Sequence, residues 1–163
     1  MSKINQDVLA KMDGITLLNK NVNLRNFPDF LILGPQRTGS TWLHRNLKLH
    51  PQVFLTTPKE IFFFNLVKSP EHHLYQSNDL EWYLEFYHES FKSYLKNNLN
   101  SLQKYGELYR PKVRGEATAS YATMSRDLIE NVVRLNPNIK AILLIRNPII
   151  RAWSHAKKDL LNL

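Results

Sequence analysis

The sequence predicts an α/β fold of three layers, with helices on both sides of a central parallel sheet. Two short aliphatic runs, FLIL at 30–33 and AILLI at 141–145, are each followed by a polar loop and then by a segment with helical spacing. Near-continuous apolar runs of this length are typical of parallel strands that are covered on both faces. Strands that alternate with helices in this way form a parallel sheet.

The composition is that of one globular domain. The chain has 163 residues, of which 43% are hydrophobic, and its net charge is +8. The charge indicates an anionic partner, without selecting among nucleotides, anionic sugars, nucleic acids and membrane surfaces. The chain has no cysteine, which excludes disulfides and is typical of a reducing compartment. Because no apolar run has the length of a signal peptide or of a membrane span, we expect a cytoplasmic protein.

Proline and glycine residues mark the boundaries of the first predicted elements. Residues 1–27 are expected to be an N-terminal extension and residues 28–163 the domain itself. A strand at 30–33 leads into the glycine-containing loop GPQRTGST at 34–41, and a helix then runs to the residue before Pro51. Its buried side is expected to carry Trp42, Leu43, Leu47 and Leu49.

The middle of the chain continues the alternation. VFLTT at 53–57 predicts a second strand, and the three phenylalanines that follow predict a buried connection. From Leu80 to Leu95 apolar residues recur every three or four positions, which predicts a single helix. Ser125 is expected to cap the next helix. The strand at 141–145 then leads through Arg146 into a final helix.

The loop after the first strand can bind a phosphate or sulfate group. Gly34 and Gly39 surround a turn that leads directly into a helix, so that backbone N–H groups and the helix N-terminus can converge on an anion. The loop also offers the side-chain donors of Arg37, Thr38, Ser40 and Thr41. Ligands of parallel sheets lie at the carboxyl ends of the strands, where this loop and Arg146 are both expected.

This loop is similar to the ATP-binding P-loop but departs from it. The P-loop has a lysine directly after its second glycine, where this chain has Ser40, and the cation here is Arg37 within the loop. The strand at 141–145 is followed by Arg146 and not by the aspartate that helps to hold magnesium in many nucleotide hydrolases. Two strand ends that each carry a cation and no acid indicate a nucleotide with two anionic groups, bound without a metal.

The segments GPQRTGSTW and LIRNPIIRAWSH together resemble the two signature segments of the sulfotransferases that use 3′-phosphoadenosine 5′-phosphosulfate (PAPS). The first resembles the 5′-phosphosulfate loop of that family. The second resembles its R-x-P-x-x-R-x-x-S segment at Arg146, Pro148, Arg151 and Ser154. The resemblance covers about residues 28–160, and family members continue well beyond it. We therefore expect residues 28–163 to be the PAPS-binding part of a longer sulfotransferase domain.

The resemblance implies a role for each matched position. Arg37 stands where many members have a lysine that contacts the bridging oxygen and steadies the leaving phosphate. Trp42 would shape the adenosine side of the site, and Arg146 with Ser154 would bind the 3′-phosphate. The 5′-phosphosulfate would be cradled by Thr38, Gly39, Ser40 and Thr41.

The acceptor needs a general base, because its hydroxyl or amine loses a proton as it attacks sulfur. PKEIFFFN at 58–65 and LEWYLEFYHE at 80–89 resemble the heparan sulfate N-sulfotransferase branch of the family, in which the glutamate before the aromatic run is the catalytic base. The resemblance gives this role to Glu60. Ala117 stands where heparan-type enzymes carry a lysine, so the implied acceptor is a small molecule or a carbohydrate in general.

Two alternatives remain open at this level. The chain could be a P-loop kinase or NTPase with an altered loop, or an inactive remnant that binds a nucleotide without turnover. We expect no bound metal, because the adjacent His72 and His73 have no further ligand at a suitable spacing. We also expect no nucleic-acid partner, because no aromatic and basic recognition motif is present, and no membrane partner, because no apolar run approaches the length of a membrane span.

Overall fold

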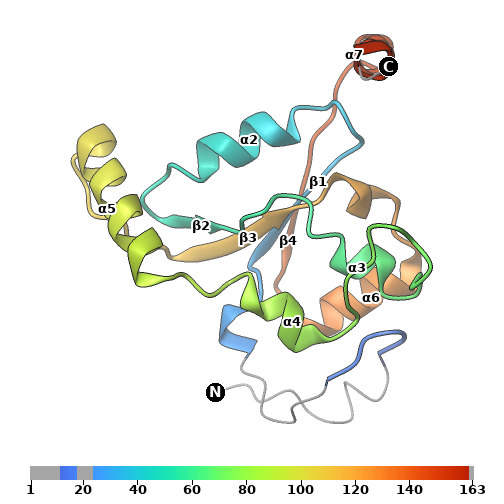
Figure 1. Ribbon diagram of the computed structural model, residues 1–163, viewed down its shortest axis with the longest axis horizontal. Coiled ribbons are helices and arrows are strands. Elements are labelled where there is room, and N and C mark those ends of the chain that lie inside the picture. The colour runs from blue at the N-terminus through green and yellow to red at the C-terminus, as the bar shows by residue number, and fades with distance from the viewer. Residues whose placement is uncertain (1–11, 18–23, 162–163) are drawn as a thin grey trace.

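The computed structural model describes residues 12–17 and 24–161 as a parallel sheet with helices on both faces (Figure 1). The strand order is β2-β3-β1-β4, and all three pairings are parallel. The strands are β1 (Phe30–Leu33), β2 (Val53–Leu55), β3 (Val113–Ala117) and β4 (Lys140–Leu143). The helices are α2 (Ser40–Leu47), α3 (Phe63–Leu66), α4 (Leu80–Glu85), α5 (Phe91–Tyr105), α6 (Arg126–Leu135) and α7 (Pro148–Leu161), with 3₁₀ turns η1 (Leu24–Asn26) and η2 (Ala119–Thr123). The predicted fold class is confirmed.

The two faces of the sheet are covered by different elements. Alternate residues of a strand point to opposite faces, so Phe30 and Ile32 pack with the α2 residues Leu43 and Leu47 on one side. Leu31 belongs to the larger core on the other side, which contains residues of α3, α4 and α6. Figure 1 shows α2 on one side of the sheet and these three helices on the other. β1 and β2 are buried between these two layers, which explains their continuous apolar character. β4 lies at the edge of the sheet and is largely exposed, although its run is just as apolar.

Aromatic rings hold the connection after β2 against the sheet. Phe63 stacks on Tyr83 of α4 with the ring centroids 4.7 Å apart, and Phe64 meets the same ring edge-on at 4.9 Å. Phe64 also contacts the ring of Tyr121 in η2 at 5.7 Å. All four side chains are fully buried or nearly so. The connection that was expected to be buried is therefore a fixed part of the core, and it begins directly after the segment that carries Glu60.

Two local predictions are wrong. The segment from Leu80 to Leu95 is not one helix, because α4 ends at Glu85 and the side chain of Ser90 accepts a hydrogen bond from Ser93 N to start α5. An N-cap serine satisfies a backbone donor that would otherwise lack a partner, and it favours a new helix over continuation. The predicted buried side of α2 includes Trp42 and Leu49, but these side chains are 69% and 41% exposed.

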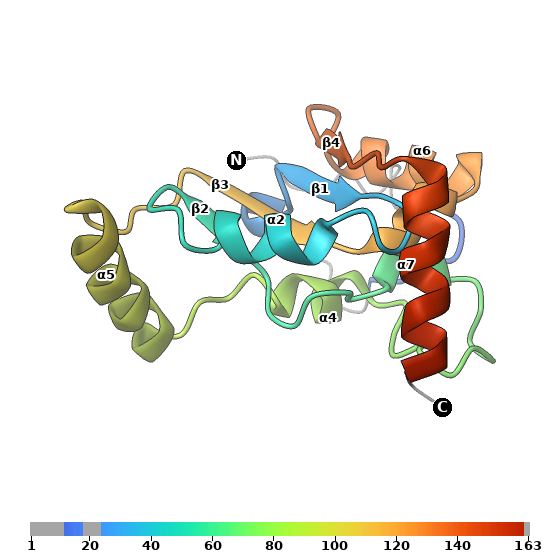
Figure 2. The same cartoon turned by 90° about the horizontal axis from the view of Figure 1, so that it is seen from above.

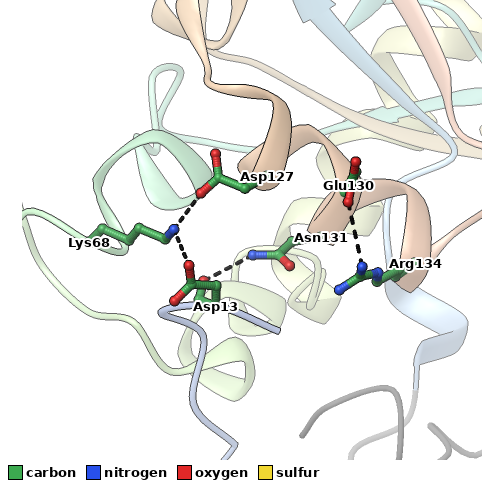
Figure 3. A network of polar contacts seen from close by, with 6 residues as sticks. All are labelled: Asp13, Lys68, Asp127, Glu130, Asn131 and Arg134. Atoms are coloured by element: carbon green, nitrogen blue, oxygen red, sulfur yellow. Dashed lines mark hydrogen bonds and ion pairs between the residues drawn. The ribbon is translucent and has the colours of Figure 1, made fainter. Parts of the chain in front are cut away.

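Residues 12–17 pack on the same core as the rest of the chain. Ile15 is buried there, and Figure 3 shows Lys68 between the carboxylates of Asp13 and Asp127, with which it forms ion pairs. Asn131 Nδ2 donates to the backbone oxygen of Asp13 at 2.9 Å. This part of the expected N-terminal extension is therefore attached to the start of α6. Residues 24–27 of the extension are described as well, and Phe27 is buried in the same core, whereas residues 1–11, 18–23 and 162–163 lie outside the described residues.

Candidate functional site

The candidate site begins where two neighbouring strands end. Leu33 of β1 is paired with Leu143 of β4, and Leu144 N donates to Leu33 O at 3.1 Å. The loop that starts at Gly34 and the segment that leads to Arg146 therefore leave the sheet side by side. Figure 2 shows α7 lying across the carboxyl ends of these strands. This is the edge of a parallel sheet at which ligands bind.

Glycines allow the loop between β1 and α2 to fold back tightly. Gly39 has a φ of 105° and precedes the first residue of α2, a backbone conformation that glycine adopts without steric cost. A Cβ atom on Gly34 would lie 3.1 Å from Leu144 O, so the close approach of the two segments also requires a glycine. Arg37 at the tip of the loop has a φ of 71°. The result is that the N-terminus of α2 opens toward the space beside α7.

Hydrogen bonds join this loop to the last part of the chain. Arg146 Nη1 donates to the backbone oxygen of Arg37 at 2.9 Å. Arg37 Nε in turn donates to Ser154 Oγ on α7 at 3.0 Å. Arg37 thus ties the loop at two points to the second segment that the sequence singled out, although more than 100 residues separate it from each partner.

A pocket of about 430 Å³ lies between the loop, α7 and the segment after β2. Seven of the predicted site residues line it: Arg37, Gly39, Ser40, Thr41, Glu60, Arg146 and Ser154. Both strand ends and the proposed base therefore face one space. Their chemical roles remain predictions, but the chain brings them to the same place.

The pocket does not include two of the predicted residues. The hydroxyl of Thr38 donates to Pro35 O at 2.8 Å within the loop, and Thr38 is not among the residues that line the pocket. Trp42 lies further along α2, largely exposed and also outside the pocket lining. In this structure Thr38 shapes the loop, and Trp42 is exposed to solvent outside the pocket lining.

Glu60 is held beside the pocket by one hydrogen bond of its backbone and one of its carboxylate. Its N–H donates to Ala117 O at 2.9 Å, and its carboxylate Oε2 accepts a hydrogen bond from Ala119 N, also at 2.9 Å. The residue has a φ of 65°, an unusual value for a side chain other than glycine. Lys59 forms an ion pair with the same carboxylate. Residues held in such conformations are concentrated at functional sites.

Sequence reasoning missed two cations of the pocket, Lys59 and Lys158. Lys158 lies four residues after Ser154 on α7, and residues at this spacing share one helix face, so the helical pattern could have identified it. Lys59 is the neighbour of Glu60 along the chain, and an extended backbone would have placed the two on opposite sides. The lining contains four cations and one carboxylate, which makes the pocket suited to a ligand with several negative charges.

The described part of the chain, at 12–17 and 24–161, contains no candidate metal centre and no membrane-spanning helix. No group of three histidine, cysteine, aspartate or glutamate side chains there could hold a metal ion. None of the helices at 24–161 is long and apolar enough to cross a membrane.

A buried carboxyl group on β3 is a feature that the sequence pattern does not predict. Glu116 of β3 is fully buried beside three buried tyrosines, Tyr83, Tyr87 and Tyr121. Burial raises the pKa of Glu116 to about 8, and neither of its carboxyl oxygens has a hydrogen-bond partner among the described residues. At neutral pH this side chain is therefore mostly a neutral acid in the folded protein.

Glu116→Gln is expected to make the protein more stable at pH 8 than the wild type. The pKa of Glu116 rises from 4.5 to about 8 on folding, so its contribution to stability is fully present below pH 4.5 and is lost as the pH rises through 8. An amide of the same shape has no such loss. Urea unfolding of both proteins between pH 4 and 8 should give a difference in unfolding free energy that reaches at most about 4 kcal/mol. Taking the difference removes the histidines that titrate in the same range, and a difference independent of pH would contradict the assignment.

Comparison with known proteins gives matches over most of the chain. A family model described as "Sulfotransferase family" matches residues 28–161. The chain is 30% identical over 127 residues to the membrane-associated sulfotransferase kil1 of Dictyostelium discoideum, which covers 78% of this chain and 22% of that protein. It is 39% identical over 74 residues to the human bifunctional heparan sulfate N-deacetylase/N-sulfotransferase 2, covering 42% of this chain and 8% of the relative.

A solved structure matches the fold. The crystal structure of a sulfotransferase from Alicyclobacillus acidocaldarius superposes with a TM-score of 0.54 at 21% identity, covering 83% of this chain and 51% of that one. The chain thus spans about half the length of this structural relative and less than a quarter of the two curated relatives above. The structural likeness supports the arrangement of the sheet and its helices.

Proposed function

Because the chain belongs to the sulfotransferase family, we propose that its pocket binds PAPS and that it transfers the sulfuryl group to a hydroxyl or amine acceptor. One observation carries this proposal: Arg146 and Ser154 line the same pocket as Arg37 and Glu60. A nucleotide with a phosphosulfate at one end and a phosphate at the other needs donors at both ends. Guanidinium groups are well suited to such oxyanions, because they present several N–H donors in a fixed plane.

The residues divide into those that bind and those that react. Arg146 and Ser154 would bind the 3′-phosphate, and the start of α2 at Gly39, Ser40 and Thr41 would bind the 5′ end through backbone N–H groups and the positive end of the helix dipole. The hydrogen bonds of Arg37 to Arg146 and Ser154 tie the loop after β1 to the segment after β4 and keep these two groups of donors at a fixed separation. Fixed donors need no rearrangement when charge develops.

In the proposed reaction Glu60 accepts the proton of the acceptor while the acceptor oxygen or nitrogen forms a bond to sulfur. The bond from sulfur to the bridging oxygen breaks, and this oxygen keeps the electron pair. Arg37 and the α2 N–H groups stabilise the negative charge on the leaving phosphate. The products are the sulfated acceptor and adenosine 3′,5′-bisphosphate, and the four cations of the pocket make a metal unnecessary for charge balance.

The acceptor that we propose is a small molecule or a carbohydrate. The carbohydrate option is supported by the relatives whose names include heparan sulfate N-sulfotransferase. The open pocket beside Glu60 is lined by Phe62, Ala119 and Lys59, a mixture of apolar and charged groups that suits a polar acceptor with a carbon framework.

The proposal is tested by incubating the chain with ³⁵S-labelled PAPS and acceptors that carry hydroxyl or amine groups, in the presence of EDTA. We expect label to be transferred to at least one acceptor, with equimolar release of adenosine 3′,5′-bisphosphate and no effect of the chelator. Magnesium-dependent hydrolysis of ATP without any turnover of PAPS would contradict the proposal and would favour a kinase or NTPase.

A further inference from the structure

The segment that carries Glu60 is fastened to the end of β3 by a row of hydrogen bonds. Two of these hold Glu60 itself, through Ala117 O and Ala119 N. Thr118 lies between these two residues. Its Oγ1 accepts a hydrogen bond from Ile61 N at 3.1 Å, so every residue from 117 to 119 contributes to the position of Glu60 or of its neighbour.

The hydroxyl of Thr118 makes this contact and does not cap the 3₁₀ turn η2 that follows it. Thr118 stands at the N-cap of η2, yet its side chain makes no capping hydrogen bond there. Threonine at an N-cap usually accepts from the first turn of its own helix. Here the hydroxyl is directed to a residue 57 positions earlier, and the side chain is completely buried, where no water can replace this acceptor.

The contact is made between two residues before α3 that have positive φ values. Glu60 and Phe62 have φ values of 65° and 61°, and Ile61 lies between them with 3% of its surface exposed. Left-handed conformations of such residues persist only where surrounding contacts enforce them. The bond from Ile61 N to Thr118 Oγ1 is made at the centre of this short stretch, next to Glu60.

We propose that Thr118 is a positioning residue for the general base, acting through the backbone of Ile61 to hold the Glu60 carboxylate toward the pocket. The inference rests on the proposed role of Glu60 as base. Thr118 does not line the pocket, so it should affect the rate of transfer and not the binding of the nucleotide.

The test compares Thr118→Val, which keeps the shape of the side chain but removes the acceptor, with Thr118→Ser, which keeps the hydroxyl. We expect the valine variant to lower kcat for sulfuryl transfer about 10- to 100-fold, because small displacements of a catalytic group have effects of this size. The serine variant should retain kcat within about threefold, and the Kd for adenosine 3′,5′-bisphosphate should change less than about threefold in both. If the valine variant does not fold, Thr118→Ala removes the same acceptor with less bulk.

A double-variant cycle separates this inference from the proposed function. In a Glu60→Gln background Thr118→Val should have no further effect on kcat, because groups that act as one unit are not additive. An equal loss in both backgrounds, or an unchanged kcat in the folded single variant, would overturn the positioning role. If Glu60→Gln itself left kcat unchanged, the base assignment would fail whatever the result for Thr118.

Discussion

Replacing Glu60 with glutamine is expected to lower kcat for sulfuryl transfer about 10²- to 10⁴-fold, the usual contribution of a positioned general base. Glutamine keeps the size of the side chain and an oxygen that can accept the hydrogen bond from Ala119 N. It cannot take the acceptor proton. Rates are measured at saturating PAPS and acceptor, and nucleotide affinity is measured separately by calorimetry.

The matched control is Glu71→Gln, which makes the same chemical change at an exposed residue outside the pocket lining. The control should retain the wild-type rate. Nucleotide affinity of Glu60→Gln should stay within about threefold of wild type, because the role proposed for Glu60 is in proton transfer and not in nucleotide binding. A Glu60→Gln variant with full activity would exclude this residue as the base.

Arg146→Ala is expected to weaken the binding of adenosine 3′,5′-bisphosphate about 10- to 100-fold. Hydrogen bonds to charged groups each contribute about 1.5 to 3 kcal/mol, and the variant loses both the proposed contact to the 3′-phosphate and the bond from Arg146 Nη1 to Arg37 O. The position of the loop tip is therefore affected together with the charge. Kd is measured by calorimetry at one fixed salt concentration, since exposed charges are screened by salt.

Arg126→Ala serves as the control for net charge in that experiment. Arg126 is exposed, pairs with Glu130 on α6, and lies outside the pocket lining. It should leave Kd unchanged within about twofold, because long-range charge effects are small at moderate salt. Similar losses for Arg146→Ala and Arg126→Ala would mean that the affinity comes from the overall positive charge and not from a specific site.

The sequence was sufficient to predict the parts of the site that lie at strand ends. Aliphatic runs before Gly34 and before Arg146 indicated two parallel strands, and parallel strands bring their carboxyl ends to one edge of a sheet. The meeting of Arg37 with Arg146 and Ser154 followed from this rule. Glu60 was assigned by resemblance alone, and its place in the pocket depends on bonds to Ala117 and Ala119 that no local pattern predicts.

Other features depend on tertiary contacts that the sequence pattern does not reveal. Glu116 is an acid that would be assigned to the surface, but β3 lies between β1 and β2 and places it in the core beside buried tyrosines. Lys59 and Glu60 both line the pocket although they are neighbours in the chain. Glu60 has a positive φ, which the sequence pattern does not predict. Ser90 is a local signal for the break between α4 and α5. Apolar residues continue at helical spacing on both sides of it, so the pattern alone predicts one helix.

The central claim is that one pocket binds both ends of a nucleotide with two anionic groups. Its most direct test is calorimetric titration of the wild-type chain with adenosine 3′,5′-bisphosphate and with adenosine 5′-monophosphate, both in EDTA. We predict that the 3′-phosphate tightens Kd at least about tenfold, the effect of one charge-assisted hydrogen bond. Equal Kd values for the two nucleotides would contradict the claim, since the cations beyond β4 would then not bind the 3′-phosphate.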